Sequence, residues 1–150
     1  MNVLLDTCVV IDYLGRKEPF FHDAELIMAA GFFRDVKLWT TGQALNDAFY
    51  VLRKYLPADQ IQQAIVELLE VITPVTLAPD DYQRAARQNW DDFEDCLVAL
   101  CAQKARADYL ITRDASGFTR SSVPPISPAD WLALMRTQKN LTYSVVSLED

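Results

Sequence analysis

Two short apolar segments, one near each end of the chain, place the strongest constraint on its fold. Residues 3–5 form a continuous apolar run that ends at Asp6, and residues 109–112 form a second apolar segment that Asp114 follows closely. A short continuous apolar run is typical of a strand buried on both faces, and such strands belong to parallel sheets covered by helices. The sequence therefore predicts an α/β protein.

Helices and strands alternate along the rest of the chain. Pro74 restricts its extended segment to an edge of the sheet or to a connection, because proline cannot donate a ladder hydrogen bond. Asp23 and Ser127 are expected to cap helices, and Pro79 lies in the first turn of another. The alternation predicts an α/β/α sandwich with a central, mainly parallel sheet of four to five strands. Helices are expected at residues 7–14, 23–33, 42–52, 61–69, 79–90 and 128–135, with another opened by the acids at 91–95, and strands at 2–6, 36–40, 71–76, 109–112 and 123–126.

Residues 1–136 are expected to form one domain, and residues 137–150 a C-terminal tail. With 150 residues, the chain is long enough for one hydrophobic core. The tail contains a small apolar cluster at 143–146, for which an extra strand, a partner contact and a frayed end are all open. No apolar run reaches the roughly 18–20 residues that span a membrane, and the N-terminus lacks a signal-peptide pattern. A cytoplasmic protein is therefore expected.

Charge and cysteine usage argue against several function classes. The formal net charge of −7, from 21 acids and 14 bases, argues against binding nucleic acid through general positive charge. Cys8, Cys96 and Cys101 have no zinc spacing, and the single histidine, His22, has no nucleophile motif beside it. A zinc site and a Ser-His or Cys-His hydrolase are therefore not expected.

Four acids adjoin the ends of predicted elements and form the candidate site. Asp6, Asp95 and Asp114 follow or adjoin strand ends, and Asp47 lies near the start of the helix after the second strand. Because the carboxyl ends of parallel strands share one edge, these carboxylates are expected to meet there and to repel one another unless a cation neutralises them. Mg²⁺ and Mn²⁺ prefer oxygen ligands, and such a site supports attack of water on a phosphodiester. Taken singly, Asp6 is equally well explained as a helix N-cap, and Asp47 as a solvated acid.

Three segments carry a family resemblance. They are LLDTCVVIDYL at the N-terminus, ALNDAFYVLRKY in the middle and DFEDCLVALCAQKARADYLITRD toward the C-terminus. Together they resemble the acidic motifs of PIN domains, in the bacterial branch that includes the VapC-type toxins of toxin–antitoxin systems. The resemblance extends over about residues 1 to 135 and keeps the motifs in order.

The resemblance implies an Mg²⁺- or Mn²⁺-dependent endoribonuclease, which cleaves RNA phosphodiester bonds with a metal-activated water. Carried over by position, it implies metal ligation by Asp6, Asp95 and Asp114. It implies a fourth catalytic acid at Asp47, which orients the metal or the water. Asp92 is the alternative to Asp95, because the acids crowd together at the start of that helix.

The chain departs from the family pattern at three of these positions. Cys8 replaces the usual asparagine, and Gly117 replaces the usual acid after the fourth motif. Asp47 stands where the toxins usually have glutamate, and the neighbouring Asn46 leaves the register of this acid open by one residue. These departures concern the geometry of the second and fourth acids.

Basic residues that follow the strand ends are the expected substrate-binding residues. Arg16 and Arg113 are candidates for contacts with phosphates, together with Lys17 and Arg120, and the alternative for each is a solvated surface base. Thr112 matches the small hydroxyl residue often found before the fourth acid, and is grouped with them. The resemblance also implies a homodimer and a small antitoxin partner, besides the RNA substrate.

Two other functions are alternatives to a nuclease. A haloacid-dehalogenase-like phosphatase needs a second acid two residues after the first aspartate, and this position is Cys8, so that class is set aside. A PIN-like module that binds RNA or protein with little or no nuclease activity remains the alternative. The presence of all four acids favours the enzyme.

Overall fold

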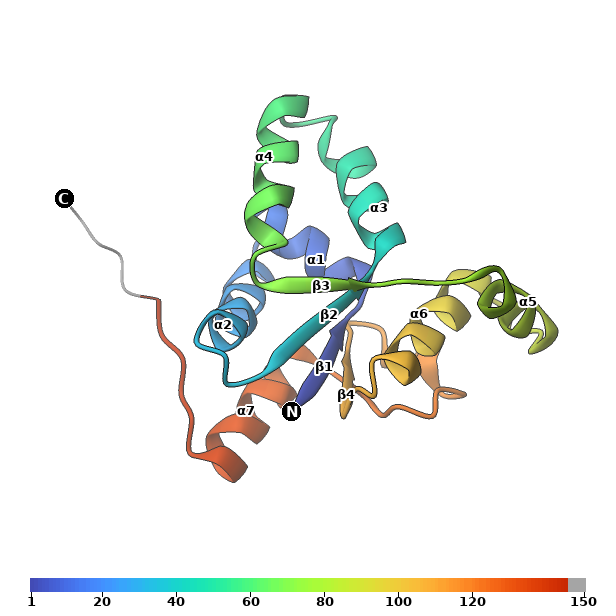
Figure 1. The fold of residues 1–150 in the computed structure, drawn as a ribbon. Helices are drawn as coiled ribbons and strands as arrows, with labels where there is room; N and C mark the ends of the chain where they lie inside the picture. Colours follow the sequence, from blue (N-terminus) through green and yellow to red (C-terminus); the bar gives the residue numbers. More distant parts are fainter. Residues whose placement is uncertain (146–150) are drawn as a thin grey trace.

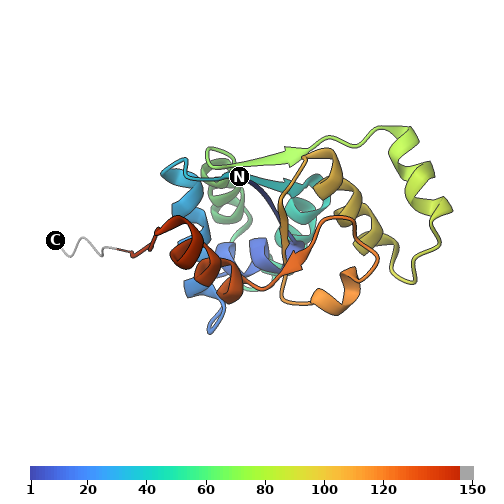
Figure 2. The same ribbon diagram turned by 90° about the horizontal axis from the view of Figure 1, so that it is seen from below.

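The computed structural model describes residues 1–145, which form a five-stranded sheet between layers of helices (Figures 1 and 2). This architecture confirms the predicted α/β sandwich. The strands are β1 (Asn2–Leu5), β2 (Lys37–Thr41), β3 (Ile72–Val75), β4 (Tyr109–Ile111) and β5 (Pro125–Ile126). The helices are α1 (Thr7–Leu14), α2 (Phe21–Phe32), α3 (Gly42–Leu52), α4 (Ala58–Leu68), α5 (Pro79–Arg87), α6 (Phe93–Lys104) and α7 (Pro128–Lys139), with a 3₁₀ turn, η1 (Ala115–Phe118).

The sheet has the strand order β3-β2-β1-β4-β5, and every neighbouring pair is parallel. Its central strand is β1, in which Leu4 pairs with Trp39 on one side and with Leu110 on the other. Pro74 lies in β3, an edge strand, as its missing N–H predicts. The five strands agree with the expected four to five.

The alternating side chains of β1 enter two separate core layers. Val3 and Leu5 belong to the layer that contains Ile27 of α2 and Trp131 of α7. Leu4 belongs to the layer on the other face, with Val98 of α6. Burial of the strand on both faces therefore explains its continuous apolar run, and the helices cover both sides of the sheet (Figure 2).

Helix α2 begins earlier than expected, so the predicted N-cap at Asp23 is wrong. Phe20 occupies the N-cap position without a side-chain hydrogen bond, and Asp23 lies in the first turn. The Phe21 ring stacks on Tyr13 of α1, with 6.2 Å between ring centroids. This packing between α1 and the start of α2 explains why α2 begins before Asp23. The other predicted cap, Ser127, is confirmed, because its hydroxyl accepts from the backbone N–H of Asp130.

The C-terminal helix extends past the expected domain boundary at residue 136. Helix α7 continues to Lys139 and ends at Asn140, whose backbone is left-handed (φ 54°). Leu141 and Tyr143 then pack against the core, and the Tyr143 hydroxyl donates to Asp35 at 3.0 Å. The rest of the predicted tail, residues 146–150, lies outside the described residues. Among the helices that the structure describes, none is long and apolar enough to cross a membrane.

Candidate functional site

The candidate site lies at the carboxyl edge of the sheet, where the strand order reverses. The chain proceeds from β1 to β2 and β3 in one direction, whereas β4 and β5 lie on the other side of β1. Such a reversal opens a crevice outside the carboxyl ends of the strands, the usual place for ligands in open α/β sheets. Asp6 directly follows β1, and Asp114 comes three residues after the end of β4.

Asp6 is buried at the start of α1 and is held by three neighbours. Its Oδ1 accepts from the backbone N–H of Thr7 at 2.8 Å, and its Oδ2 accepts from the Thr112 hydroxyl at 2.7 Å and the Cys8 thiol at 3.6 Å. Burial raises the pKa of Asp6, although these hydrogen bonds partly offset the effect. Burial and the nearby Asp6 raise the pKa of Cys8 to about 11, so the thiol remains protonated. Asp6 therefore caps α1 and also belongs to the acidic site.

Thr112 is fully buried and forms hydrogen bonds with Asp6 and with the backbone of Asp114. Its hydroxyl donates to Asp6 and accepts from the backbone N–H of Asp114 at 3.0 Å. It thus fixes the position of Asp6 relative to the chain segment that carries Asp114. Thr112 was expected to bind substrate; in this structure its side chain is fully buried, and its contacts are those of a residue that positions the acids.

The first turn of α6 contributes two acids to the site. Asp92 is the N-cap and accepts from the backbone N–H of Asp95 at 3.2 Å, while Asp95 lies in the first turn. Glu94 accepts from the Thr7 hydroxyl at 3.2 Å, which joins the start of α6 to the start of α1. Side chains in the first turn of a helix lean toward its N-terminus, which brings both Glu94 and Asp95 toward the same edge. Asp92, the alternative to Asp95, has the capping role.

All four predicted acids line one open cleft of about 440 Å³. Asp47 reaches it from α3, where its Oδ1 accepts from the Gln43 side chain at 2.8 Å. Asn46, the alternative to Asp47, does not line this cleft. Glu94 also lines the cleft and was not among the predicted site residues, although it lies beside Asp95 at the helix start. The cleft is lined by Asp6, Thr7, Cys8, Ile11, Asp47, Tyr50, Val51, Glu94, Asp95 and Asp114.

The acids in the cleft repel one another. Burial, followed by the charges of Asp92 and Asp6, raises the pKa of Asp95 to about 6. Burial also raises the pKa of Glu94; the hydrogen bond from Thr7 opposes this shift, and the charges of Asp47, Asp6 and Asp92 add to it. Like charges held in one cleft favour protonation or the binding of a cation.

The donor set fits a hard divalent cation, because it consists of carboxylate oxygens. Gly117 supports this reading: a Cβ built there would lie 2.7 Å from Asp95 Oδ2 and 3.3 Å from Asp114 Oδ2, so both carboxylates border the space that its missing side chain leaves open. Within residues 1–145, no three His, Cys, Asp or Glu side chains are already arranged around one metal position.

The predicted basic residues lie outside the acidic cleft. Arg113 donates from Nε and Nη2 to the buried Asp12 of α1 at 2.7 and 3.2 Å, a pairing that sequence analysis missed. Arg120 donates to the carbonyl oxygens of residues 88 and 89, and its guanidinium lies 5.4 Å from the Trp90 ring. Arg16 is exposed and lies near the Phe21 ring. The guanidinium groups of Arg113 and Arg120 therefore form hydrogen bonds within the protein.

Comparisons with known proteins bear on the family and the fold of this chain. The family model of the PIN domain matches residues 2–116. The structure is similar to a chain in VapBC-1 from nontypeable Haemophilus influenzae, with a TM-score of 0.62, 19% identity and coverage of 86% of this chain and 99% of that chain. It is also similar to a chain in a toxin–antitoxin complex from Klebsiella pneumoniae, with a TM-score of 0.60, 21% identity and coverage of 84% and 97%.

A third structure with this fold is VapC20 from Mycobacterium tuberculosis, a sarcin–ricin loop cleaving toxin. Its TM-score is 0.54 at 13% identity, with coverage of 72% of this chain and 86% of that chain. Comparison with curated protein sequences finds no significant match. The family match covers most of the chain and includes all five acids that line the cleft. The chain therefore belongs to the PIN domain family.

Proposed function

We propose that this protein is an Mg²⁺- or Mn²⁺-dependent endoribonuclease. The observation that supports the proposal is the meeting of Asp6, Asp47, Asp95 and Asp114 in one cleft at the carboxyl edge of the sheet. These residues come from four separate parts of the chain, so their proximity is not a consequence of local sequence. Membership of the PIN domain family agrees with a nuclease of this kind.

The four acids divide into two roles in the proposed reaction. Asp6, Asp95 and Asp114 would hold the divalent cation, and Thr112 holds Asp6 in place through its hydroxyl. A cation bound there would supply positive charge to the phosphate and lower the pKa of a water molecule. Asp47 Oδ1 accepts from Gln43, which leaves Oδ2 able to accept a proton from the attacking water.

The proposed biological role is the toxin of a toxin–antitoxin pair. Several structures with the same fold are VapBC or other toxin–antitoxin complexes, and VapC20 is a cleaving toxin. By this analogy the protein would act in the cytoplasm as a homodimer, and a small antitoxin would hold it inactive. Growth arrest on expression alone, relieved by a small neighbouring open reading frame, would separate a toxin from a housekeeping nuclease.

A PIN-like binding module without nuclease activity is the second candidate. It is favoured by one observation: within the described residues, no three potential ligands already surround a common metal position. The two candidates differ in a direct way. The enzyme requires a divalent cation to turn over RNA, whereas the module binds its partner without cleaving it.

Purified protein is expected to cleave single-stranded RNA with Mg²⁺ or Mn²⁺ and to lose this activity in EDTA. Asp6→Asn is expected to remove cleavage, because the amide lacks the charge that would hold the cation, while asparagine still caps α1. Gel analysis of a set of RNAs of varied sequence measures both effects. Absence of cleavage of every RNA with either metal, or equal cleavage by Asp6→Asn and the wild type, would contradict the enzyme.

Thr112→Val is expected to reduce both stability and cleavage. Valine preserves the shape of the side chain but leaves the backbone N–H of Asp114 without its acceptor and removes one of the three donors to Asp6, at a cost of about 1–3 kcal/mol in unfolding free energy. Loss of such an orienting contact typically lowers metal affinity or activity by about 10- to 100-fold. Urea unfolding and RNA cleavage at several Mg²⁺ concentrations measure the two effects. Thr112→Ser retains the hydroxyl and should recover most of each, whereas wild-type behaviour of the valine variant would refute the positioning role.

A further inference from the structure

The C-terminal ends of α1 and α3 lie side by side, one length of helix α1 away from Asp6 of the acidic cleft. Helix α1 starts beside Asp6 and α3 carries Asp47, so both helices lead away from the cleft. At their far ends Gly15 approaches Leu52 so closely that a Cβ on the glycine would lie 2.8 Å from Leu52 Cδ2. The residues that follow the two helices are therefore neighbours, although they are far apart in the sequence.

These neighbouring segments are basic. Arg16 and Lys17 follow α1, Arg53 and Lys54 follow α3, and all four side chains are exposed. They are four of the 14 lysine and arginine residues in a chain of net charge −7. Among the described residues, none of the four forms a salt bridge, and the one acid in the connection between α1 and α2 is Glu18.

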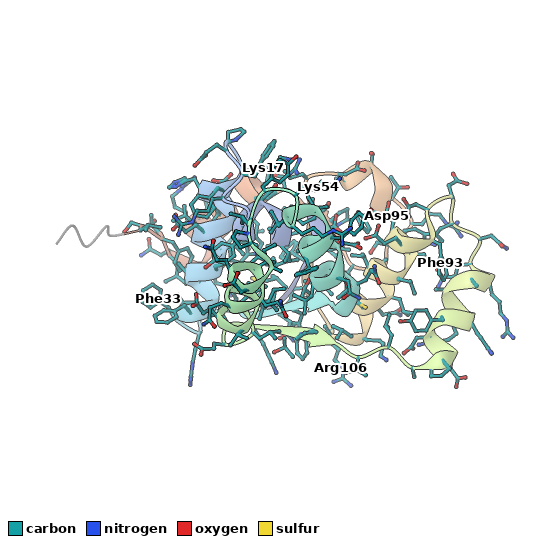
Figure 3. All side chains as sticks on the ribbon, turned by 90° about the horizontal axis from the view of Figure 1, so that it is seen from above. Lys17, Phe33, Lys54, Phe93, Asp95 and Arg106 are labelled. Atoms are coloured by element: carbon teal, nitrogen blue, oxygen red, sulfur yellow. The ribbon has the colours of Figure 1, made fainter. Side chains whose placement is uncertain are left out.

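Aromatic rings lie beside three of these cations, and one of the rings also lines the cleft. Lys54 Nζ and the Arg53 guanidinium lie 5.8 and 4.6 Å from the Tyr50 ring, which is 57% exposed and also lines the acidic cleft. Lys17 Nζ lies 6.0 Å from the ring of Phe20. Tyr50 thus connects the cations of Arg53 and Lys54 with the acids of the cleft. Figure 3 labels Lys17, Lys54 and Asp95 on this part of the molecule.

Helix electrostatics explain only part of this arrangement. A cation at a helix C-terminus gains about 0.3–1 kcal/mol from the helix dipole, which accounts for Arg53 at the C-cap of α3. It does not account for an exposed tyrosine beneath two unpaired cations. Lysine and arginine beside exposed aromatic rings match the phosphates and unstacked bases of single-stranded RNA.

We propose that Lys17, Phe20, Tyr50, Arg53 and Lys54, here called the helix-end surface, bind the single-stranded RNA that flanks the scissile phosphodiester. The inference rests on the proposed nuclease function for the identity of the ligand. The cations of the helix-end surface offset the repulsion between RNA phosphates and the acids of the cleft. The Tyr50 ring stacks on a base beside the cleavage site. Arg16 is excluded, because it lines a separate pocket together with Glu25 and Glu67.

The test measures binding of a fluorescein-labelled single-stranded RNA in EDTA, so that no cleavage occurs. The variant Arg53→Gln/Lys54→Gln is expected to bind about tenfold more weakly at 50 mM salt, and the slope of log affinity against log salt is expected to fall by about 1.4. Tyr50→Leu is expected to lose about fivefold or more in affinity. The matched control is Arg34→Gln/Lys37→Gln, which removes one arginine and one lysine at the opposite, amino edge of the sheet, where Lys37 Nζ lies 4.7 Å from the Trp39 ring.

The outcomes separate this inference from the proposed function. Weak binding by the helix-end variant and normal binding by the control support the inference, whether or not the wild type cleaves RNA with Mg²⁺. Equal losses in the two double variants, or wild-type affinity in Arg53→Gln/Lys54→Gln, would overturn it even if cleavage is intact. In the latter case a protein partner that covers the helix-end surface becomes the better explanation. Absence of RNA binding by the wild type would overturn it as well.

Discussion

Asp95→Asn is expected to abolish RNA cleavage and, at the same time, to stabilise the metal-free protein. The expected loss of cleavage is at least about 1,000-fold, because several kcal/mol of charge stabilisation by the cation depend on its ligands. Asparagine has the same shape as aspartate and remains compatible with the first turn of α6. A defect of this size therefore reports on the lost charge at the site and not on the fold.

The gain in stability follows from the raised pKa of Asp95. Burial and the neighbouring acids raise this pKa from 3.8 to about 6, so the folded protein binds the proton more tightly than the unfolded chain does. Ionisation of Asp95 therefore costs folding free energy. In EDTA the stability should fall as the pH rises from about 4 to about 6 and then stay at the lower level. Because the carboxylate is partly exposed, solvent reduces the expected cost to about 1 kcal/mol.

Urea unfolding in EDTA at several pH values measures this effect. At pH 7.5 Asp95→Asn should be about 1 kcal/mol more stable than the wild type, and the two should converge below about pH 4. Mg²⁺ should stabilise the wild type and leave the variant unchanged, because binding to the folded state alone raises its stability. Asp59→Asn is the matched control, since Asp59 lies in the first turn of α4 and is exposed.

A less stable Asp95→Asn protein in EDTA would show that Asp95 contributes more as a helix-start acid than it costs through repulsion. Equal stabilisation of both proteins by Mg²⁺ would show that Asp95 is not needed to hold the ion. Either result would mean that Asp95 has only a structural role, the favourable interaction of a first-turn acid with the helix dipole. The Asp59 control identifies changes caused by the loss of one negative charge in general.

The particular element ends that carry the four acids could be predicted from the sequence, and with them the backbone positions of these acids. Asp6 ends an apolar run and Asp95 lies among the acids that start α6, so local pattern is sufficient to locate both. The parallel sheet then brings strand ends to one edge. Glu94 was harder to assign, because the side chains of adjacent helical residues normally point in different directions. Glu94 and Asp95 both reach the cleft only because the helix starts at its edge.

Roles that depend on distant pairing could not be predicted in this way. Asp12 lies within an apolar segment of α1, and nothing near it in the sequence indicates its partner, Arg113, which is 101 residues away. The role of Thr112 likewise depends on Asp6, 106 residues away. Asp23 looked like a cap by composition, but packing of aromatic residues moved the start of α2. In each case a tertiary contact decided the outcome over the local pattern.

Arg113→Met is expected to destabilise the protein by about 3–5 kcal/mol. Arg113 donates two hydrogen bonds to Asp12, whose side chain is only 2% exposed, and within the described residues Asp12 has no other side-chain partner. Removal of the arginine leaves a buried carboxylate without compensation, which is costly because burial strongly disfavours an unpaired charge. The Arg113 guanidinium also lies 3.9 Å from the Phe20 ring, and methionine retains part of that packing.

The double variant Asp12→Leu/Arg113→Met is expected to recover most of the lost stability, because it removes the buried charge together with its partner. Urea unfolding of the wild type, the two single variants and the double variant forms a complete cycle. Arg84→Met is the control: Arg84 also pairs with a buried aspartate, but Asp81 keeps Lys104 and the backbone N–H of residue 78 as partners, so a loss of at most about 1 kcal/mol is expected.

A small effect of Arg113→Met on unfolding, combined with a large loss of RNA affinity, would mean that Arg113 serves the substrate, as its position beside Asp114 first indicates. The opposite pattern would mean that it serves the fold. Because Arg113 adjoins both Thr112 and Asp114, the Asp12 pair also anchors the segment that carries the fourth acid to α1, which starts at the first. A cleavage defect that Asp12→Leu rescues along with stability would therefore assign the contribution of Arg113 to this anchoring, since the double variant has no guanidinium left to contact RNA.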